Sequence, residues 1–213
     1  MEIRREQITG LVLAGGRGTR MGGVDKGLQK FRGEPMALLA ARRLQPQVGA
    51  LLINANRHAG EYAKLGAPVC VDAIEGYAGP LAGMHAGLAA CVTDYLATVP
   101  CDSPLLPADL VNRLAGALAQ QGADAAVALA GPAGQAHRHP VFLLLKRSLL
   151  PQLTAYLEGG GRKVGEWLAS LACAEARFDD EQAFANVNTL AELDALAAAA
   201  PRQREGQPPD EAR

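Results

Sequence analysis

The chain has 213 residues, of which 49% are hydrophobic, and its 21 basic and 22 acidic residues give a formal net charge of −1. This length and apolar content suit a single globular core, and the balanced charge argues against a surface built for nucleic acid, so any anion site would be local. The four cysteines lie far apart without C-x-x-C spacing. That pattern argues against a zinc site or a disulfide framework and fits a reducing compartment.

The N-terminal residues MEIRREQ are followed by only a short apolar run before glycines begin. This run is too short for a secretory signal, and no apolar run reaches the ~18 residues of a membrane span. We therefore expect a cytoplasmic protein without membrane contact.

Apolar runs of strand length alternate with segments of helical length. The expected strands are residues 8–14, 50–56, 67–72, 94–102, 123–130 and 140–146. The expected helices are residues 34–45, 79–92, 107–121, 149–158 and 162–171, with Pro35 and Pro80 at the first helical position of the first two. Strands that are apolar on both faces and separated by helices indicate βαβ units. The sequence therefore predicts an α/β fold: one Rossmann-like domain with a mostly parallel twisted sheet and helices on both faces.

The C-terminal region predicts one more helix and then a tail. Thr189 and Glu192 have the spacing of a capping box, which would start a final amphipathic helix. The last residues, PRQREGQPPDEAR, are polar and rich in proline. We expect one domain over residues 1–200 and a disordered tail over residues 201–213.

A glycine-rich segment, LAGGRGTRMGGVDKG at residues 13–27, follows the first expected strand, and six of its 15 residues are glycine. A dinucleotide fingerprint would have Met21 where its third glycine belongs, and the segment lacks the Lys–Ser/Thr pair of a P-loop. The remaining interpretation is a loop whose backbone N–H groups surround an anion, with Arg17, Arg20 and Lys26 around it. Such a site has the size of a triphosphate; a glycine-rich surface turn is the alternative.

Five blocks in the sequence together resemble the molybdenum cofactor guanylyltransferases (molybdopterin-guanine dinucleotide synthases). They are LAGGRGTRMGGVDKGL, INANRH, GPLAGM, PCDSPLLP and ANVNT, in the order of the family, and they span residues 8–197. The first block is shared by sugar-phosphate, cytidylyl and other nucleotidyltransferases, whereas the combination is typical of the guanylyltransferases. The departures, at Gly18, Thr19 and the C-terminal extension, do not touch the expected chemistry.

The resemblance implies transfer of GMP from GTP to the molybdopterin cofactor, with Mg²⁺ as the metal and pyrophosphate as the second product. It implies GTP and molybdopterin as ligands, transient contact with cofactor-insertion proteins or apo-molybdoenzymes, and a monomer. Three alternatives stay open. They are a cytidylyltransferase of the same cofactor, a sugar-phosphate nucleotidyltransferase, and a GTP-binding carrier that performs no chemistry.

The reaction would join two anions by in-line attack on the α-phosphorus, so charge neutralisation and alignment would dominate its barrier. Arg20 and Lys26 would balance charge on the leaving pyrophosphate. Backbone N–H groups would be offered to the nucleotide by Leu13, Ala14, Gly15 and Gly16.

Asp102 follows an apolar strand, and ligands of open α/β sheets bind at the carboxyl ends of strands. Mg²⁺ accepts one or two carboxylates together with phosphate oxygens and waters. Asp102 is therefore the candidate metal ligand and, with Arg20 and Lys26, an expected catalytic residue. A turn residue that caps DSPLLP is the alternative.

Further contacts to the substrates come from the resemblance. It assigns nucleotide contacts to Asn54 and Asp72, which lie at the ends of apolar strands. Gly79 and Gly83 would permit close approach of the base or ribose, because glycine has no side chain. The resemblance assigns the pterin or the metal shell to Asn186 and Asn188. Ordinary turn residues, a tightly packed helix and loop asparagines are the respective alternatives.

Two basic segments, HRHP at residues 137–140 and GGGRKV at residues 159–164, could face the second substrate through Arg138, Arg162 and Lys163. Solvated surface charge is the alternative. Cys101, beside the candidate metal ligand, is expected to be a small core residue because the sequence offers no general base for it.

Overall fold

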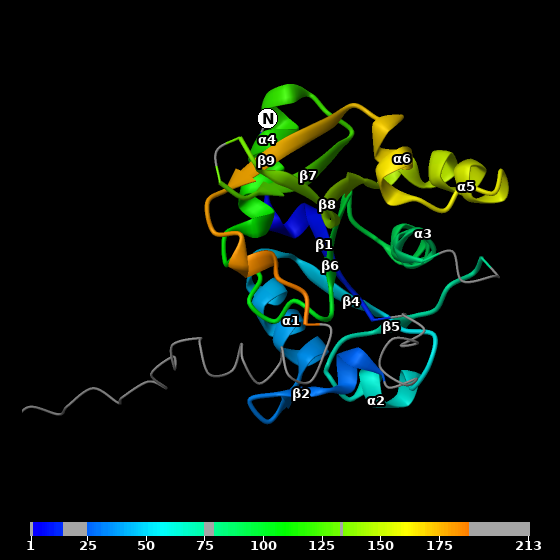
Figure 1. Ribbon diagram of the computed structural model, residues 1–213. Helices are drawn as coiled ribbons and strands as arrows, with labels where there is room; N and C mark the ends of the chain where they lie inside the picture. Colours follow the sequence, from blue (N-terminus) through cyan, green and yellow to red (C-terminus); the bar gives the residue numbers. More distant parts are fainter. Residues whose placement is uncertain (1, 15–24, 75–78, 133, 188–213) are drawn as a thin grey trace, which may run out of the picture.

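The computed structural model describes residues 2–14, 25–74, 79–132 and 134–187. A seven-stranded sheet has the order β5-β4-β1-β6-β8-β7-β9 (Figure 1). The strands are β1 (Ile8–Leu13), β4 (Ala50–Asn54), β5 (Val69–Cys70), β6 (Tyr95–Pro100), β7 (Ala125–Ala130), β8 (His137–Lys146) and β9 (Cys173–Phe178). A separate hairpin pairs β2 (Lys30–Phe31) with β3 (Glu34–Pro35).

Helices cover both faces of the sheet, which confirms the predicted α/β class. They are α1 (Met36–Leu44), α2 (Ala59–Ala63), α3 (Pro80–Ala90), α4 (Leu110–Gln121), α5 (Leu150–Glu158) and α6 (Val164–Ala169). One apolar cluster joins the sheet to α1 and α4, and a second joins its other face to α3, α5 and α6. Figure 1 shows these two groups of helices on opposite sides of the sheet. Neighbouring strand residues such as Leu11 and Val12 enter opposite clusters, because strand side chains alternate between faces. The sheet is therefore buried on both sides.

Four of the six pairings within this sheet are parallel, and β8 runs antiparallel to both of its neighbours. The chain leaves β1 toward β4 on one side and later returns to β6 on the other side of β1. The segments that follow β1 and β6 therefore diverge, and such a switch point is where open α/β sheets bind ligands.

Several local expectations differ from the structure. Pro35 lies in β3 and precedes α1 as its N-cap, whereas Pro80 occupies the first turn of α3 as predicted. β8 begins at His137, three residues before the expected start, and β9, α2 and the β2–β3 hairpin were not predicted. The final helix and the tail lie outside the described residues. In the described part of the chain, no helix is long and apolar enough to cross a membrane.

Candidate functional site

The carboxyl ends of β1, β4 and β6 meet at one edge of the sheet. Leu13 is in register with both Asn54 and Pro100, and the Cys101 N–H donates to the Leu13 carbonyl at 3.0 Å. The Ala14 N–H donates to the Asn54 carbonyl at 2.8 Å. The Ala14 amide, one of the predicted nucleotide donors, is thus part of the sheet ladder.

Lys26 and Asp102, two of the predicted catalytic residues, form an ion pair at this edge. Lys26 Nζ lies 3.3 Å from Asp102 Oδ2, and their side chains are 21% and 16% exposed. Lys26 begins the 3₁₀ turn η3 (Lys26–Leu28), whereas Asp102 follows β6 by two residues. A cation from the segment after β1 and a carboxylate from the segment after β6 therefore meet across the switch point.

Burial gives Asp102 its electrostatic character. Desolvation raises the pKa of this carboxyl above its ordinary value, and the neighbouring Lys26 charge opposes that shift. The ionised carboxylate therefore gains from each additional positive charge at this edge. Such a group suits a hard cation bound together with an anionic ligand.

Asn54 and Asp72, to which the resemblance assigned nucleotide contacts, contact each other. Asn54 is 2% exposed, and its amide Nδ2 donates to Asp72 Oδ1 at 2.9 Å and to the Cys70 carbonyl at 3.3 Å. Asn56, which sequence reasoning missed, donates to Asp72 Oδ2 at 2.7 Å and accepts the Asp72 N–H at 2.8 Å. Both oxygens of Asp72 therefore accept from amides, so the triad is held together internally. We call Lys26, Asp102, Asn54 and Asp72 the polar edge.

The two predicted glycines of the GPLAGM block serve α3. A methyl group on Gly83 would collide with the Asn54 side-chain oxygen and with Leu13, so this glycine lets α3 approach β1 and β4. Gly79 has φ 66° and ψ −150° at the N-cap of α3, a conformation that favours glycine. The structure thus supports tight helix packing at Gly83.

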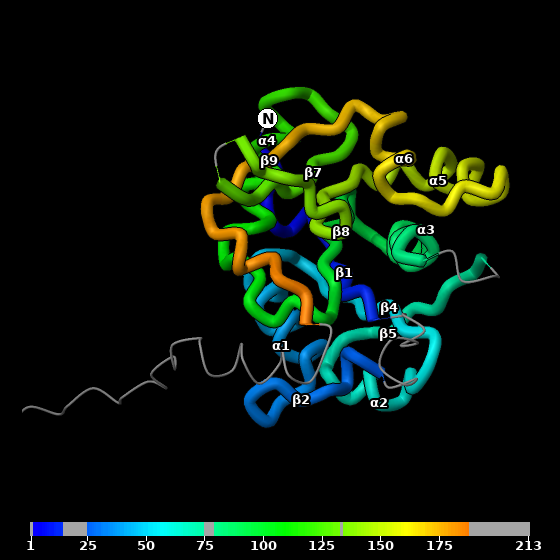
Figure 2. Tube along the Cα trace, in the orientation of Figure 1, coloured from blue at the N-terminus to red at the C-terminus, as the bar shows by residue number. Residues whose placement is uncertain are grey.

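Asn186 joins the same site from a distant part of the sequence. Ser103, which is fully buried, donates its hydroxyl to Asn186 Oδ1 at 2.7 Å, and the Val187 N–H donates to the Asp102 carbonyl at 2.9 Å. Figure 2 shows the end of the described chain, in orange, beside the green segment after β6. Sequence reasoning quoted Ser103 inside PCDSPLLP without giving it a role.

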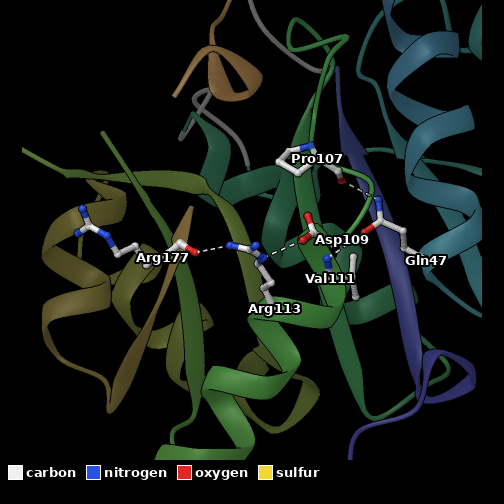
Figure 3. Close-up of polar contacts among 6 residues, drawn as sticks. All are labelled: Gln47, Pro107, Asp109, Val111, Arg113 and Arg177. Atoms are coloured by element: carbon white, nitrogen blue, oxygen red, sulfur yellow. Dashed lines mark hydrogen bonds and ion pairs between the residues drawn. The ribbon is translucent and has the colours of Figure 1, made fainter. Parts of the chain in front are cut away.

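The segment after Asp102 is held by polar contacts to the 3₁₀ turn η4 (Gln45–Gln47), which follows α1, and to β9. Gln47 accepts the Val111 N–H and donates to the Pro107 carbonyl, both at 3.0 Å, which caps the start of α4 (Figure 3). Arg113 joins the Asp109 carboxylate at 2.7 Å to the Arg177 carbonyl of β9 at 2.9 Å (Figure 3). This network connects the two segments that carry Asp102 and Asn186.

Aromatic rings pack just before Asn186. Phe184, in η6 (Gln182–Phe184), has its ring centroid 4.7 Å from that of His139, 4.9 Å from that of Phe142 and 5.0 Å from that of Phe178. We call these residues, with His137, whose ring centroid lies 4.5 Å from that of His139, the aromatic cluster. It anchors the chain immediately before the contact with Ser103.

The other basic residues suggested for the second substrate have local partners. Arg138 pairs with Glu175 at 2.7 Å, Lys163 pairs with Glu166 at 2.7 Å, and Arg162 donates to carbonyls at the end of α5. Cys101 is 7% exposed, and burial raises the pKa of its thiol well above its ordinary value, which confirms a core residue.

Five predicted contact residues, Gly15, Gly16, Arg17, Arg20 and Asn188, lie outside the described residues. Within the described part of the chain, no group of three or more His, Cys, Asp or Glu side chains could hold a metal ion by itself. A metal at Asp102 would therefore draw its remaining ligands from a bound substrate, from water or from residues beyond those described.

The chain is similar in sequence to proteins of one known family. The model of the MobA-like NTP transferase domain matches residues 10–176. The chain is 57% identical to a molybdenum cofactor guanylyltransferase from Bordetella petrii, over 91% of this chain and 99% of the relative. It is 55% identical to a protein of the same name from Cupriavidus taiwanensis, over 90% of this chain and 96% of the relative.

Solved structures share the fold. The crystal structure of molybdopterin-guanine dinucleotide biosynthesis protein A from Archaeoglobus fulgidus aligns with TM-score 0.71 and 22% identity, over 89% of this chain and 97% of that one. A CMP:2-keto-3-deoxy-manno-octonic acid synthetase complexed with CTP aligns with TM-score 0.69 and 14% identity, over 90% and 96%. At these identities the likeness establishes the fold.

Proposed function

Because the chain belongs to the MobA-like NTP transferase family and is a nucleotidyltransferase, we propose that it transfers GMP from GTP to the molybdopterin cofactor. An oxygen of the terminal phosphate of molybdopterin attacks the α-phosphorus of GTP. The bond from the α-phosphorus to the bridging oxygen breaks, and pyrophosphate leaves with the electron pair. The product is molybdopterin guanine dinucleotide. The names of the curated relatives support this substrate pair.

The observation that carries the proposal is the pairing of Lys26 with Asp102 at the switch point of the sheet. Two anionic substrates repel one another, so the site must supply positive charge and fix the line of attack. In this proposal Lys26 neutralises the charge that develops on the leaving pyrophosphate. Asp102 holds the Lys26 ammonium group in place until the nucleotide arrives.

The residues present fit Mg²⁺ with Asp102 as its protein ligand. Asp102 is a partly buried carboxylate whose pKa desolvation raises in spite of the neighbouring Lys26 charge, and Mg²⁺ binds through one or two carboxylates plus phosphate oxygens. Asp72 is less suited because both of its oxygens already accept from Asn54 and Asn56. When bound, Mg²⁺ would supply Lewis-acid neutralisation of the phosphate oxygens.

Several expectations remain predictions. They include the roles of Arg20, Gly15, Gly16 and Asn188, the nucleotide contacts of Asn54, Asp72 and Gly79, and the pterin contact of Asn186. A monomeric, cytoplasmic enzyme that passes its product to apo-molybdoenzymes or cofactor-insertion proteins is likewise a prediction.

The test is pyrophosphate release by the purified protein with Mg²⁺ and molybdopterin cofactor, compared among GTP, CTP, ATP and UTP. We expect release with GTP alone and formation of the guanine dinucleotide. Release with CTP in its place would assign the protein to the cytidylyltransferases. Tight GTP binding with no release from any nucleotide would indicate a carrier.

A matched pair of variants makes the assay specific to the site. Asp102→Asn removes the proposed metal ligand. Thr9→Val removes a buried hydroxyl that bonds Thr93 at 2.7 Å, at the amino end of β1. We expect only the first variant to lose pyrophosphate release. Both variants should be as fully folded as the parent, as measured by circular dichroism.

A further inference from the structure

The residue before Lys26 has a nearly buried carboxylate with three hydrogen-bond donors. Asp25, whose side chain is 9% exposed, accepts the Gly27 N–H at 3.2 Å and the Tyr62 hydroxyl on Oδ1. Its other oxygen, Oδ2, lies 3.1 Å from His58 Nδ1. Tyr62 belongs to α2 and His58 is the N-cap of that helix, so Asp25 connects η3 to α2.

The Tyr62 hydroxyl donates a hydrogen bond to this carboxylate. Its side chain is fully buried, and burial, with smaller contributions from Cys101 and Asp25, raises the pKa of Tyr62 well above its ordinary value. The hydroxyl therefore keeps its proton throughout the working pH range. A methyl group on Gly27 would collide with the Tyr62 hydroxyl, so glycine at this position allows the turn to close on Tyr62.

His58 supports the same arrangement from the start of α2. It has φ 52°, a conformation uncommon for a residue other than glycine. Its carbonyl accepts the Tyr62 N–H at 3.1 Å while its ring reaches Asp25. Backbone strain of this kind persists where surrounding contacts define the conformation.

Lys26 lies between the two anchored residues, Asp25 and Gly27. A 3₁₀ turn of three residues has too few backbone hydrogen bonds to fix its own orientation. The carboxylate of Asp25 bonds the turn to α2, while the Lys26 side chain extends to Asp102. The orientation of the lysine is thereby determined by a residue that does not reach Asp102 itself.

We propose that Asp25, anchored by Tyr62, is the positioning residue that aims Lys26 at the reacting phosphates. The inference rests on the proposed function, in which Lys26 neutralises charge on the leaving pyrophosphate. It also separates two aspartates at one site: Asp102 is available to a cation, whereas Asp25 is committed to hydrogen bonds within the protein. Asp25 therefore acts through Lys26.

The test is a double-mutant cycle of Tyr62→Phe and Lys26→Ala, with kcat and KM measured for the parent, both single variants and the double variant. Tyr62→Phe removes only the hydroxyl. In the parent we expect it to lower kcat about tenfold, with a smaller change in KM for GTP. In the Lys26→Ala background we expect it to lower kcat by less than about twofold. A loss of general stability would lower activity equally in both backgrounds.

Controls separate failure of the inference from failure of the proposed function. Thr9→Val, which loses a buried hydroxyl contact at the opposite end of β1, should keep the parental kcat. Unchanged kcat in Tyr62→Phe, or an equal fold loss in both backgrounds, would overturn the inference and leave the role of Lys26 intact. Full activity in Lys26→Ala would overturn that role and the inference with it. If Tyr62→Phe does not fold, Asp25→Asn replaces it in the same cycle.

Discussion

The polar edge and the aromatic cluster lie on either side of the contact between Ser103 and Asn186, and they differ in chemistry and in origin. In the polar edge, Asn54, Asp72 and Asp102 lie at or shortly after the ends of strands in the parallel half of the sheet, and Lys26 lies in η3. The aromatic cluster is built from β8, β9 and η6, which the chain adds later. One region carries charge and the other carries packed rings.

This difference separates two tasks. Charged groups that act on a phosphate must be partly accessible, so they contribute little to the core and can be changed without unfolding the protein. The packed rings of Phe142, Phe178 and Phe184 stabilise the chain that carries Asn186 and have no charge to offer the reaction. Variants of Lys26 and Asp102, the partly accessible charged residues of the polar edge, should therefore alter turnover, whereas variants in the aromatic cluster should alter stability.

The largest effect is expected from Asp102→Asn. Loss of the proposed metal ligand should lower kcat about 10²–10³-fold, the range typical of removing one electrostatic contact to a transition state. The measurement is kcat for pyrophosphate release. If the variant kept the parental kcat, Asp102 would not be a metal ligand.

The same variant makes a prediction about stability. Burial raises the pKa of Asp102, so the folded state holds its proton more tightly than the unfolded state does. The parent therefore loses stability as pH rises from the unfolded pKa of about 3.9 through the higher folded value. Asp102→Asn lacks this loss, and its free energy of unfolding at pH 7 should equal or exceed that of the parent. A clearly less stable variant would contradict the separation of the two regions.

Phe184→Ala tests the other region. Phe184 is 2% exposed and contacts three aromatic rings, so its truncation should lower the free energy of unfolding by about 3–5 kcal/mol. Urea unfolding followed by circular dichroism measures this change. The variant should keep kcat within a few-fold under conditions in which it remains folded; a stable variant with no turnover would place Phe184 in the chemistry.

Much of the polar edge was predictable from the sequence because Asn54, Asp72 and Asp102 lie at the ends of apolar strands, while Lys26 belongs to the glycine-rich segment. Parallel pairing of β4, β5 and β6 around β1 brings the ends of these strands to one edge of the sheet. What the sequence could not supply is how each carboxylate is used. Asp25 stands beside Lys26 in the chain, but its partner Tyr62 is 37 residues away and belongs to a helix of five residues.

The second region was less predictable because its elements have weak local signals. β9 reads CAEARF, with small residues and two charges, and it is an edge strand with alternating burial, so it lacks the continuous apolar run of a central strand. The contact between Ser103 and Asn186 spans 83 residues and depends on that strand being in place. Long-range packing of this kind has no periodic signature.

A smaller effect is expected where the two regions meet, from Ser103→Ala. The variant leaves Asn186 without its buried donor, which should cost about 1 kcal/mol of stability. If Asn186 holds the pterin substrate, KM for molybdopterin should rise about tenfold or less while KM for GTP stays near the parental value. A rise confined to KM for GTP would instead assign this contact to the nucleotide.

The smallest effect concerns pH and the aromatic cluster. Burial, and then the neighbouring His137, lower the pKa of His139 below its ordinary value, with Glu181 opposing. The neutral ring is therefore favoured in the folded state, and its Nε2 is buried without a hydrogen-bond partner among the described residues. As pH falls through the unfolded pKa of about 6.5 toward the lower folded value, the unfolded chain takes up a proton first and stability is lost.

His139→Phe can retain the stacking on Phe184 without a titrating group. Its free energy of unfolding, measured by urea titration between pH 7.5 and about 5, should fall less than that of the parent, while the pH dependence of kcat, which belongs to the polar edge, should stay the same. Equal slopes of stability in the two proteins would show that His139 is solvated, and a changed pH profile of kcat would show that the two regions are coupled through their shared contact.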